Sequence, residues 1–513
     1  MATTISGSQP STHGAKQQNG VPHAPRVNLS PLYNHFIGGE WVPSRSGETF
    51  ETVNPATLEV LSRVQNGTAD DVNLAVAAAQ EAFKFWGQSS PQERSAVLLK
   101  IADRLEAKLD HFAAIEAINN ARPIREYVAF DLPMAIEQFR FFAAAIRLLE
   151  GNSTTVPGGM RYTLHEPMGV VGQIIPWNVP LIMTAMKIAP ALAAGNTVVI
   201  KPAEQTPLSI LELVKEIQDV IPPGVLNVIT GFGPSAGAPL AQHPGIRKVA
   251  FTGETTTGRL ILQYASENII PATLELGGKS PGVIFPDCDL ERAVEGTIAG
   301  ICAFNGQQCI AASRLFLHEE IREPFIEKLV GKMKKIVIGD PLDPNTQLGA
   351  LVSKEQYDRV MGYIELGKQE GARVLCGGHR AEIPGFDGYF VAPTVFDRVN
   401  NRMRIAQEEI FGPVLSVITW KDYDQMIEQA NDIAYGLAGA IWTNDLKMAH
   451  QTAQALQTGT VWINRFANFN AGSPFGGYKK SGIGRELAFE TLGHYTQSKS
   501  ITIDYGSGAL GLY

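Results

Sequence analysis

The chain alternates short apolar runs with longer amphipathic stretches from Ile37 onward. The clearest helix start is Ser90-Pro91-Gln92-Glu93, which offers an N-cap, a proline at the first helical position and a glutamate three residues after the cap. An amphipathic run continues to about Leu109, and another covers roughly Asp131 to Leu149. These patterns predict two long helices in the N-terminal part of the chain.

Short runs rich in β-branched residues each precede a helical stretch in the middle of the chain. The first series consists of Val170–Ile175, Thr197–Ile200, Val225–Ile229 and Val249–Phe251. A second series consists of Gly282–Phe285, Leu315–Leu317, Val374–Leu375, Val414–Val417 and Thr460–Ile463. Strands that alternate with helices favour a parallel sheet with right-handed crossovers. The pattern therefore predicts an α/β protein with two α/β domains in tandem.

The segment from Gly151 to Pro167 follows a different pattern. It has no apolar repeat of helical period, and it carries the short extended runs Thr154-Thr155-Val156 and Tyr162-Thr163-Leu164 around a pair of glycines. This pattern predicts a β-hairpin.

Composition and charge exclude several classes of protein. Of the 513 residues, 44% are hydrophobic and 18% are charged, so the chain can bury a large core. The formal net charge of −8 argues against nucleic acid as a partner, because such a protein would carry a basic stripe. No run of 18 apolar residues occurs, so we expect no membrane-spanning helix.

Cysteine usage and the N-terminus bear on the compartment. Four cysteines are too few for a disulfide framework, and neither a CxxC nor an HExxH spacing predicts a metal site. Residues 1–30 are rich in Ser, Thr, Gln, Gly and Pro and lack the apolar region of a signal peptide. We expect these residues to form a disordered tail and the protein to be cytoplasmic.

Two glycine-rich loops raise the question of a phosphate site. Gly231–Gly237 is one residue longer than GxGxxG and contains a proline, and Arg259-Leu260 follows Gly253–Gly258 where a P-loop has Lys-Ser/Thr. A glycine turn between a strand and a helix still offers backbone amides to an anion. Each loop alone is equally consistent with a plain connection.

Lys201-Pro202-Ala203-Glu204 follows the strand predicted at 197–200. Ligands of open α/β sheets bind at the carboxyl ends of the strands, where Glu204 could accept hydrogen bonds from ribose hydroxyls and Lys201 could donate. On this segment alone, a surface ion pair is the simpler interpretation.

Cys309 is the candidate nucleophile, because it lies among polar residues, whereas Cys302 and Cys376 lie in apolar runs typical of buried thiols. A single cysteine of this kind is more often inert, so a partner is needed. Glu275 stands between two leucines at a strand end and is costly to bury without a role. Asn178, fixed between two prolines, could donate to a developing oxyanion.

Seven motifs in order resemble the NAD(P)-dependent aldehyde dehydrogenase superfamily, of the non-acylating, hydrolytic type. They are Pro176-Trp177-Asn178, Lys201-Pro202-Ala203-Glu204, Phe251-Thr252-Gly253, Leu274–Lys279, Gly306-Gln307-Gln308-Cys309, Glu409-Ile410-Phe411-Gly412-Pro413 and Pro474-Phe475-Gly476-Gly477. The resemblance runs from about Ile37 to Ile503. Each motif alone is moderately specific, but their shared order leaves chance a negligible explanation.

The resemblance implies a Rossmann-type cofactor domain, an α/β catalytic domain and a β oligomerisation arm. On this sequence the NAD-binding domain would comprise 31–150 and 167–277, the catalytic domain 278–479, and the arm 151–166 and 480–513. The arm implies a homodimer or a homotetramer, because an unpaired hairpin edge would otherwise need protection.

The resemblance also implies roles for individual residues. The Cys309 thiolate would attack an aldehyde, Asn178 and the Cys309 backbone N–H would hold the oxyanion, and Glu275 would activate water to release the acid. Residues implied to bind the cofactor are Ile174, Trp177, Lys201, Glu204, Gly233, Gly237, Phe251, Thr252, Gly253, Leu276, Glu409 and Phe411. Glu204 favours NAD over NADP, since a 2′-phosphate would meet a carboxylate. Glu254 departs from the family, where many members have serine.

Substrate choice depends on the residues implied to line the tunnel: Val179, Met186, Ala303, Phe469 and Phe475. The first three are smaller than the aromatics found in members that handle small aliphatic aldehydes, which favours a bulky or aromatic aldehyde. A medium- or long-chain aliphatic aldehyde is the alternative, as is a semialdehyde attracted by Arg465, and neighbouring side chains could also refill the space. A catalytically inert binding or structural protein of the same fold is the remote alternative.

Overall fold

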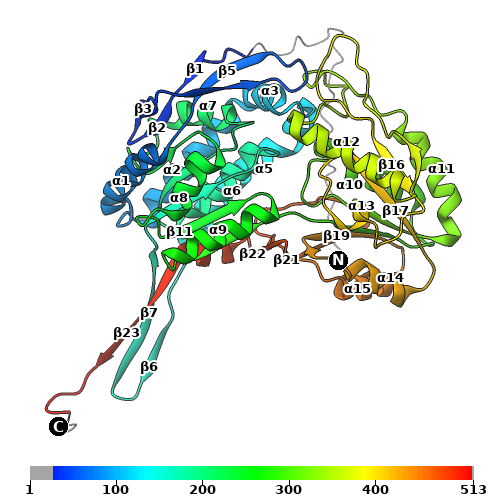
Figure 1. The fold of residues 1–513 in the computed structure, drawn as a ribbon. Coiled ribbons are helices and arrows are strands. Elements are labelled where there is room, and N and C mark those ends of the chain that lie inside the picture. Colours follow the sequence, from blue (N-terminus) through cyan, green and yellow to red (C-terminus); the bar gives the residue numbers. More distant parts are fainter. Residues whose placement is uncertain (1–26, 511–513) are drawn as a thin grey trace, which may run out of the picture.

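A computed structural model describes residues 27–510 of the chain, so most of the predicted tail (1–30) lies outside the described residues. Two large sheets, each covered by helices on both faces, form the body of the molecule (Figure 1). This arrangement confirms the predicted α/β class. Among residues 27–510, none of the helices combines the length and the hydrophobicity that crossing a membrane would require.

The first sheet has eight strands. Their order is β22 (Gly482–Ile483), β12 (Ala272–Glu275), β11 (Lys248–Thr252), β8 (Val170–Ile174), β9 (Thr197–Lys201), β10 (Leu226–Val228), β2 (His35–Ile37) and β3 (Glu40–Val42). The five central strands from β12 to β10 are parallel, and antiparallel pairs close both edges. Four of the five, all but β12, match the predicted parallel series. The carboxyl ends of five strands therefore meet at one edge of the sheet.

Side chains alternate between the two faces of this sheet. Val198 and Ile200 pack toward α2 (Pro91–Ala107), α3 (Leu109–Asn120), α5 (Leu132–Ala145), α6 (Pro180–Ala193) and α7 (Leu208–Ile217). Val199 packs toward α1 (Ala69–Trp86), α8 (Ala238–Gln242) and α9 (Thr255–Glu267) on the opposite face. The helix predicted from Ser90 is confirmed, with both capping-box bonds between Ser90 and Glu93 present.

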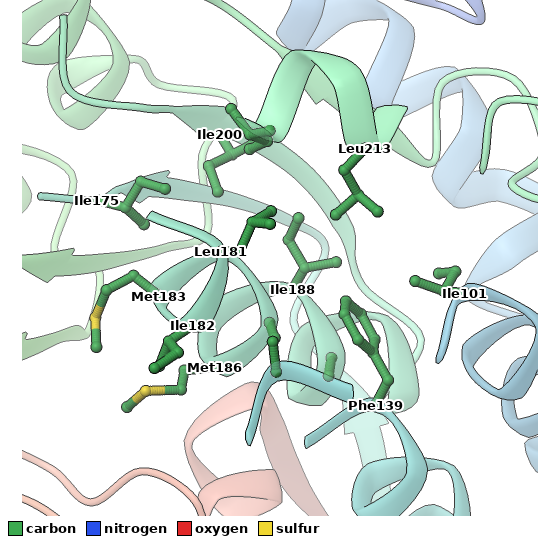
Figure 2. Packing of buried hydrophobic residues seen from close by; sticks show 14 of the residues in the cluster. Ile101, Phe139, Ile175, Leu181, Ile182, Met183, Met186, Ile188, Ile200 and Leu213 are labelled. Carbon is green, nitrogen blue, oxygen red and sulfur yellow. The ribbon is translucent and has the colours of Figure 1, made fainter. Parts of the chain in front are cut away.

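Helix α6 lies at the centre of the molecule, and every one of its residues is buried. In Figure 2, Leu181 and Ile188 pack between the sheet and the outer helices, while Met183 and Met186 lie on the other side of the helix. Each fully buried Leu, Ile or Met side chain contributes about 1.5–3 kcal/mol. Pro180 at the start of α6 suits the first helical turn, and it fixes the direction of the loop that precedes the helix.

The second sheet has seven strands. Their order is β15 (Arg373–Cys376), β16 (Thr394–Asp397), β17 (Val414–Trp420), β14 (Arg314–His318), β13 (Pro281–Ile284), β19 (Ala438–Trp442) and β20 (Thr460–Ile463). On one face lie α10 (Leu290–Cys302) and α11 (Arg322–Met333), and on the other lie α12 (Lys354–Gln369), α14 (Tyr423–Asn431) and α15 (Leu446–Ala455).

The strand predicted at Val374–Leu375 as part of a parallel series is in fact antiparallel. It belongs to β15, which pairs with β16 at the sheet edge. The pattern missed β16 and β19, which the sheet inserts between predicted strands. An edge strand needs only one partner, so a short connection can reverse its direction.

The predicted hairpin is confirmed as β6 (Ser153–Val156) and β7 (Gly159–Pro167). Strand β23 (Thr496–Asp504) pairs along the whole length of β7, so segments more than 300 residues apart form one three-stranded sheet. Figure 1 shows this ribbon projecting away from the body.

Shorter elements complete the fold. They are β1 (Leu32–Tyr33), β4 (Thr49–Val53) and β5 (Val60–Gln65) in one small sheet, β18 (Tyr435–Gly436) paired with β21 (Tyr478–Lys479), and the short helices α4 (Ile124–Glu126) and α13 (Arg404–Gln407).

Candidate active site

Two pockets meet at Cys309. The first is polar at one end and is lined by Trp177, Thr252, Gly253, Glu254, Glu275, Leu276, Gly277, Gln356, Arg359, Glu409 and Phe411, among others. The second is apolar and includes Phe130, Met134, Ile182, Met186, Phe304, Phe469, Phe475 and Leu487. Cys309, Asn178, Val179 and Met183 line both pockets. A molecule in each pocket would therefore approach the same sulfur atom from two sides.

Strand ends of the first sheet supply one side of this junction. Asn178 lies in the loop between β8 and α6, next to the N-cap residue Val179, and Glu275 is the last residue of β12. Because these strands are parallel, their carboxyl ends lie at the same edge, as expected for a ligand site of an open α/β sheet.

Cys309 arrives from the second sheet, after helix α10. The chain turns there through three consecutive residues of left-handed backbone, Phe304 (φ 57°), Asn305 (φ 56°) and Gly306 (φ 71°). Asn305 is buried and holds the turn, because its amide donates to Ala121 O (3.1 Å) and Ala350 O (2.8 Å) and its oxygen accepts from Gly349 N (2.7 Å). Two non-glycine residues in this conformation are costly unless the surroundings fix them.

The Cys309 thiol is neutral in this structure. Burial raises its pKa to about 12, and the nearby negative charges of Glu409 and Glu275 act in the same direction. Cys302 and Cys376 are buried, as predicted, and Cys302 packs its sulfur 3.6 Å from the sulfur of Met333. Of the three, only Cys309 lines the two pockets.

Asn178 is 6% exposed and donates one amide hydrogen to Gln307 O at 3.0 Å. Its backbone carbonyl accepts from the Arg122 guanidinium at 3.0 Å, so both ends of the residue are held. The side-chain nitrogen carries a second hydrogen that this bond leaves free for a ligand.

Glu275 is buried, and burial raises the pKa of its carboxyl well above the ordinary value. The charge of Glu486 acts in the same direction, while Lys187 and Arg485 lower it. Lys187 and Glu486 form a buried ion pair although they are 299 residues apart. The sequence motifs did not indicate this pair. The single indication of a buried charge was a lysine within the apolar run that forms α6.

The polar pocket has the features that a dinucleotide requires. Glu409 accepts a bond from Gly278 N at 2.9 Å, and burial raises its pKa to about 7. A Cβ at Gly277 would lie 2.3 Å from a carboxylate oxygen of Glu409, so a larger residue there would displace this carboxylate. Trp177 and Phe411 meet edge-on with ring centres 5.2 Å apart. Trp177, Thr252, Gly253, Leu276, Glu409 and Phe411, all named from the sequence, line this one pocket.

The remaining residues implied to bind the cofactor form a neighbouring group at the ends of β8 and β9. Lys201 donates to Pro202 O (2.8 Å) and Gly231 O (2.7 Å), and its Nζ lies 3.6 Å from Glu204. A Cβ at Gly237 would lie 3.5 Å from Lys201 and 3.8 Å from Ile174. Gly233 and Gly237 bound a single wide helical turn, and the Phe251 ring packs against Gly253. The side chain of Glu204 is 29% exposed and free to accept hydrogen bonds from a ligand.

Glu254 lies in the polar pocket but turns onto helix α9. Its carboxylate accepts from Thr256 N (2.8 Å) and Thr257 N (3.1 Å), which makes it the N-cap of that helix. This geometry is how a carboxylate is accommodated where many family members have serine.

The apolar pocket contains Val179, Met186, Phe469 and Phe475, four of the five residues implied to line a tunnel. Ala303 does not line it; the left-handed turn places the Phe304 ring there instead. Phe130 meets Phe304 at 5.7 Å and Phe469 at 6.0 Å, and Phe469 meets Phe475 at 5.2 Å. Arg465 is exposed and lies outside the lining. Aromatic rings thus surround the approach to the sulfur.

A parallel α/β sheet with a cleft at the carboxyl ends of its strands, next to a candidate cysteine nucleophile, is the arrangement expected of a nicotinamide-dependent dehydrogenase. The sequence model of the aldehyde dehydrogenase family matches residues 41–501. The chain belongs to this family. It is an aldehyde dehydrogenase that oxidises aldehydes with NAD.

Relatives and solved structures support this over nearly the whole chain. An aldehyde dehydrogenase of Deinococcus radiodurans is 47% identical over 99% of this chain and 100% of its own length. The NAD+ complex of an aldehyde dehydrogenase from Bacillus cereus has a TM-score of 0.91 at 44% identity, covering 94% of this chain and 100% of that one. Pseudomonas syringae indole-3-acetaldehyde dehydrogenase, solved with NAD+ and IAA, has a TM-score of 0.91 at 38% identity, covering 93% and 97%.

Proposed function

We propose that this enzyme oxidises a bulky or aromatic aldehyde to its carboxylic acid through Cys309, with NAD as the hydride acceptor. The observation that carries the proposal is the junction of the polar cleft and the aromatic-lined pocket at one cysteine sulfur. An aldehyde whose ring or chain fills the apolar pocket presents its carbonyl carbon to that sulfur, next to the place where the cofactor binds.

The reaction proceeds in two stages. In the first, the Cys309 thiol loses its proton to water, the thiolate sulfur forms a bond to the aldehyde carbon as the carbonyl π bond opens, and the carbonyl oxygen becomes an oxyanion held by the Asn178 amide and the Cys309 N–H. Bound NAD would supply the acceptor for the hydride that leaves this carbon, and collapse of the oxyanion would leave a thioester on Cys309. In the second stage, Glu275 takes a proton from water, the water oxygen attacks the thioester carbon, and the carbon–sulfur bond breaks to release the acid.

The electrostatics of the site make the second stage of the reaction depend on removal of the proton from the Glu275 carboxyl. Burial and the charge of Glu486 raise the pKa of the Glu275 carboxyl, whereas a general base must be ionised. The ammonium of Lys187 opposes this effect. We therefore infer that hydrolysis of the thioester becomes faster as the pH rises.

Rings that line the pocket favour an aromatic or bulky substrate, because aromatic pairs gain energy beyond simple burial. Relatives are named for diverse aldehydes: a long-chain aldehyde in Acinetobacter, fluoroacetaldehyde in Streptantibioticus cattleyicolor and indole-3-acetaldehyde in P. syringae. A medium- or long-chain aliphatic aldehyde or a semialdehyde is the alternative. The half-buried Phe130 adds a further ring to the lining, and Arg465 is not part of it.

The test is NADH production across a panel of acetaldehyde, hexanal, benzaldehyde, a cinnamaldehyde and succinic semialdehyde. We expect the highest kcat/KM with the aromatic members; a preference for acetaldehyde or the semialdehyde would refute the assignment. Cys309→Ser should abolish turnover, whereas the matched variant Cys288→Ser, which changes a thiol outside both pockets, should not. An inert binding protein would show no turnover in any form.

Cofactor preference and assembly follow from two other features. Glu204 at the end of β9 would repel a 2′-phosphate, so we expect kcat/KM for NAD to exceed that for NADP, and Glu204→Ser to narrow the difference. The sheet of β6, β7 and β23 exposes Leu164 and Ile503, and its edge would pair with a second subunit. In this assignment the sheet belongs to the oligomerisation arm (151–166 and 480–513). The other two domains are the NAD-binding domain (31–150 and 167–277) and the catalytic domain (278–479). Light scattering should give a dimer or a tetramer.

A further inference from the structure

Arg122 is a fully buried arginine that neither the motifs nor the proposed chemistry uses. It lies between α3 and α4, directly after Ala121, which ends α3 in left-handed backbone (φ 60°). Burying an arginine is costly unless charge and hydrogen bonds compensate it. The contacts of this side chain therefore need an explanation.

The guanidinium uses all five of its N–H donors. It forms a two-pronged pair with Asp131 (2.8 and 2.9 Å), two longer bonds with Glu126 (3.2 and 3.3 Å), and one bond to the backbone carbonyl of Asn178 (3.0 Å). Two carboxylates compensate the charge, which leaves the bond to Asn178 as a contact that charge balance does not require.

The same guanidinium also contacts the turn that leads to Cys309. Its central carbon is 4.0 Å from the centre of the Phe304 ring, a cation–π contact, and Tyr127 lies at 4.5 Å from it. Glu126, bound to Arg122, also accepts from the backbone N–H of Phe304 at 3.1 and 3.2 Å. Arg122 thus contacts the loop that carries Asn178. Together with Glu126, it also contacts the turn at Phe304 that leads to Cys309.

From this geometry we propose that Arg122 is a positioning residue that holds the Asn178 amide and the Phe304 wall of the substrate pocket in fixed relation to Cys309. The inference rests on the proposed function, because it needs Asn178 to hold the oxyanion. A positioning role for Arg122 affects two properties of the enzyme, the stabilisation of the oxyanion and the fit of the substrate. Loss of the bond to Asn178 loosens the oxyanion donor for every aldehyde, and loss of the ring contact loosens the wall that an aromatic aldehyde touches.

Lysine cannot replace arginine in this role. An ammonium is a compact charge with three donors, so it cannot reach two carboxylates and a carbonyl together, and it lacks the flat face that lies on Phe304. Arg122→Lys keeps the charge near Asp131 and Glu126 but removes the fixed geometry. A misplacement of about 1 Å in an active site costs on the order of 10²-fold in rate.

The experiment compares Arg122→Lys with Arg322→Lys. Arg322, the first residue of α11, also pairs with a carboxylate: its Nη2 donates to both oxygens of Asp397 (2.7 Å each), and it lines neither pocket. Both variants are measured for thermal unfolding, for NADH binding by fluorescence, and for kcat and KM with acetaldehyde and benzaldehyde. The active-site concentration is taken from the NADH burst.

We expect Arg122→Lys to lower kcat per active site by about 10- to 100-fold for both aldehydes and to raise KM more for benzaldehyde than for acetaldehyde, with NADH binding unchanged. Arg322→Lys should leave these kinetic constants within about twofold at a comparable loss of thermal stability. If Arg122→Lys loses stability but keeps wild-type kcat per active site and the wild-type KM ratio, its role is structural and the proposal is wrong.

A second variant protects the test if Arg122→Lys does not fold. Glu126→Gln keeps the Arg122–Asp131 pair but weakens the hold on the Phe304 N–H, and it should change the KM ratio in the same direction by a smaller factor. A wild-type ratio in this variant would overturn the proposal. Failure of the underlying function is distinguishable, because turnover by Cys309→Ser would refute the nucleophile itself.

Discussion

Replacing Asn178 with alanine tests the oxyanion hole most directly. The side chain is 6% exposed, its amide lies at the junction of the two pockets, and one of its two hydrogens is held by Gln307 O at 3.0 Å. The other is available to an oxyanion on a substrate bonded to Cys309. Asn178→Ala removes this donor and leaves the backbone nearly unchanged, because the Asn178 carbonyl that Arg122 binds is retained.

Two free energies follow from this geometry. Loss of one oxyanion donor raises the barrier by about 2.7–4 kcal/mol, which is a 10²- to 10³-fold loss of kcat. Gln307 O loses its partner in a buried place, which costs about 1–3 kcal/mol of stability. The first effect should appear in the rate of NADH formation, and the second only in the unfolding free energy.

The assay is stopped-flow NADH formation with saturating aldehyde, together with chemical unfolding of the same preparations. Asn227→Ala is the matched control: this buried asparagine of β10 donates to Val198 O (3.2 Å) and Gly224 O (2.8 Å) and lines neither pocket. It should lose at least as much stability while its burst rate stays within about twofold. A burst rate for Asn178→Ala within tenfold of wild type would refute the oxyanion assignment.

Three further predictions concern other parts of the molecule. Glu275→Gln should retain a burst of about one NADH per site and then turn over at least about 10²-fold more slowly, because acylation precedes water activation; a vanished burst would contradict this order. Burial raises the pKa of Glu116 to about 8, so the native state holds a proton that the unfolded chain releases near pH 4.5. The free energy of unfolding should therefore fall by up to about 1.4 kcal/mol per pH unit as the pH rises between these values. Glu116→Gln should remove that slope in urea titrations from pH 5 to 8, and an unchanged slope would refute the shift. Gly306→Ala should destabilise the protein by at least about 1–3 kcal/mol, since φ is +71° and a Cβ would lie 2.3 Å from the backbone of Gly412. A free energy of unfolding within about 0.5 kcal/mol of the wild-type value, the level of a neutral surface change, would contradict this backbone strain.

The sequence predicted those local features that depend only on residues close to one another in the chain. The capping box at Ser90 and Glu93 depends on a spacing of three residues, and the structure contains both of its bonds. The parallel strands of the first sheet follow from short β-branched runs between helices. The ordered motifs identified the family, because each encodes a turn or strand end that needs those residue types in sequence.

Tertiary structure decided everything that depends on distant segments. Lys187 and Glu486 are 299 residues apart and meet beside Glu275 only because α6 and the C-terminal segment pack together. The contact of Arg122 with Asn178 and Phe304 likewise joins three separate segments. A sequence pattern reports which face of an element is buried, but it does not report which other element covers that face.

The substrate pocket shows the same division. From the sequence, the small side chain of Ala303 predicted open space, whereas the fold turns Phe304 into the pocket through left-handed backbone. That conformation is unfavourable for an isolated phenylalanine and is maintained by Asn305, Glu126 and Arg122, which come from distant parts of the chain. The sequence by itself determined the family, the parallel direction of four strands of the first sheet, and three of the residues that line both pockets, Cys309, Asn178 and Val179. Only the packed structure decided the shape of the substrate pocket and the charges around Glu275, because both depend on contacts whose free energy exists only when remote segments meet.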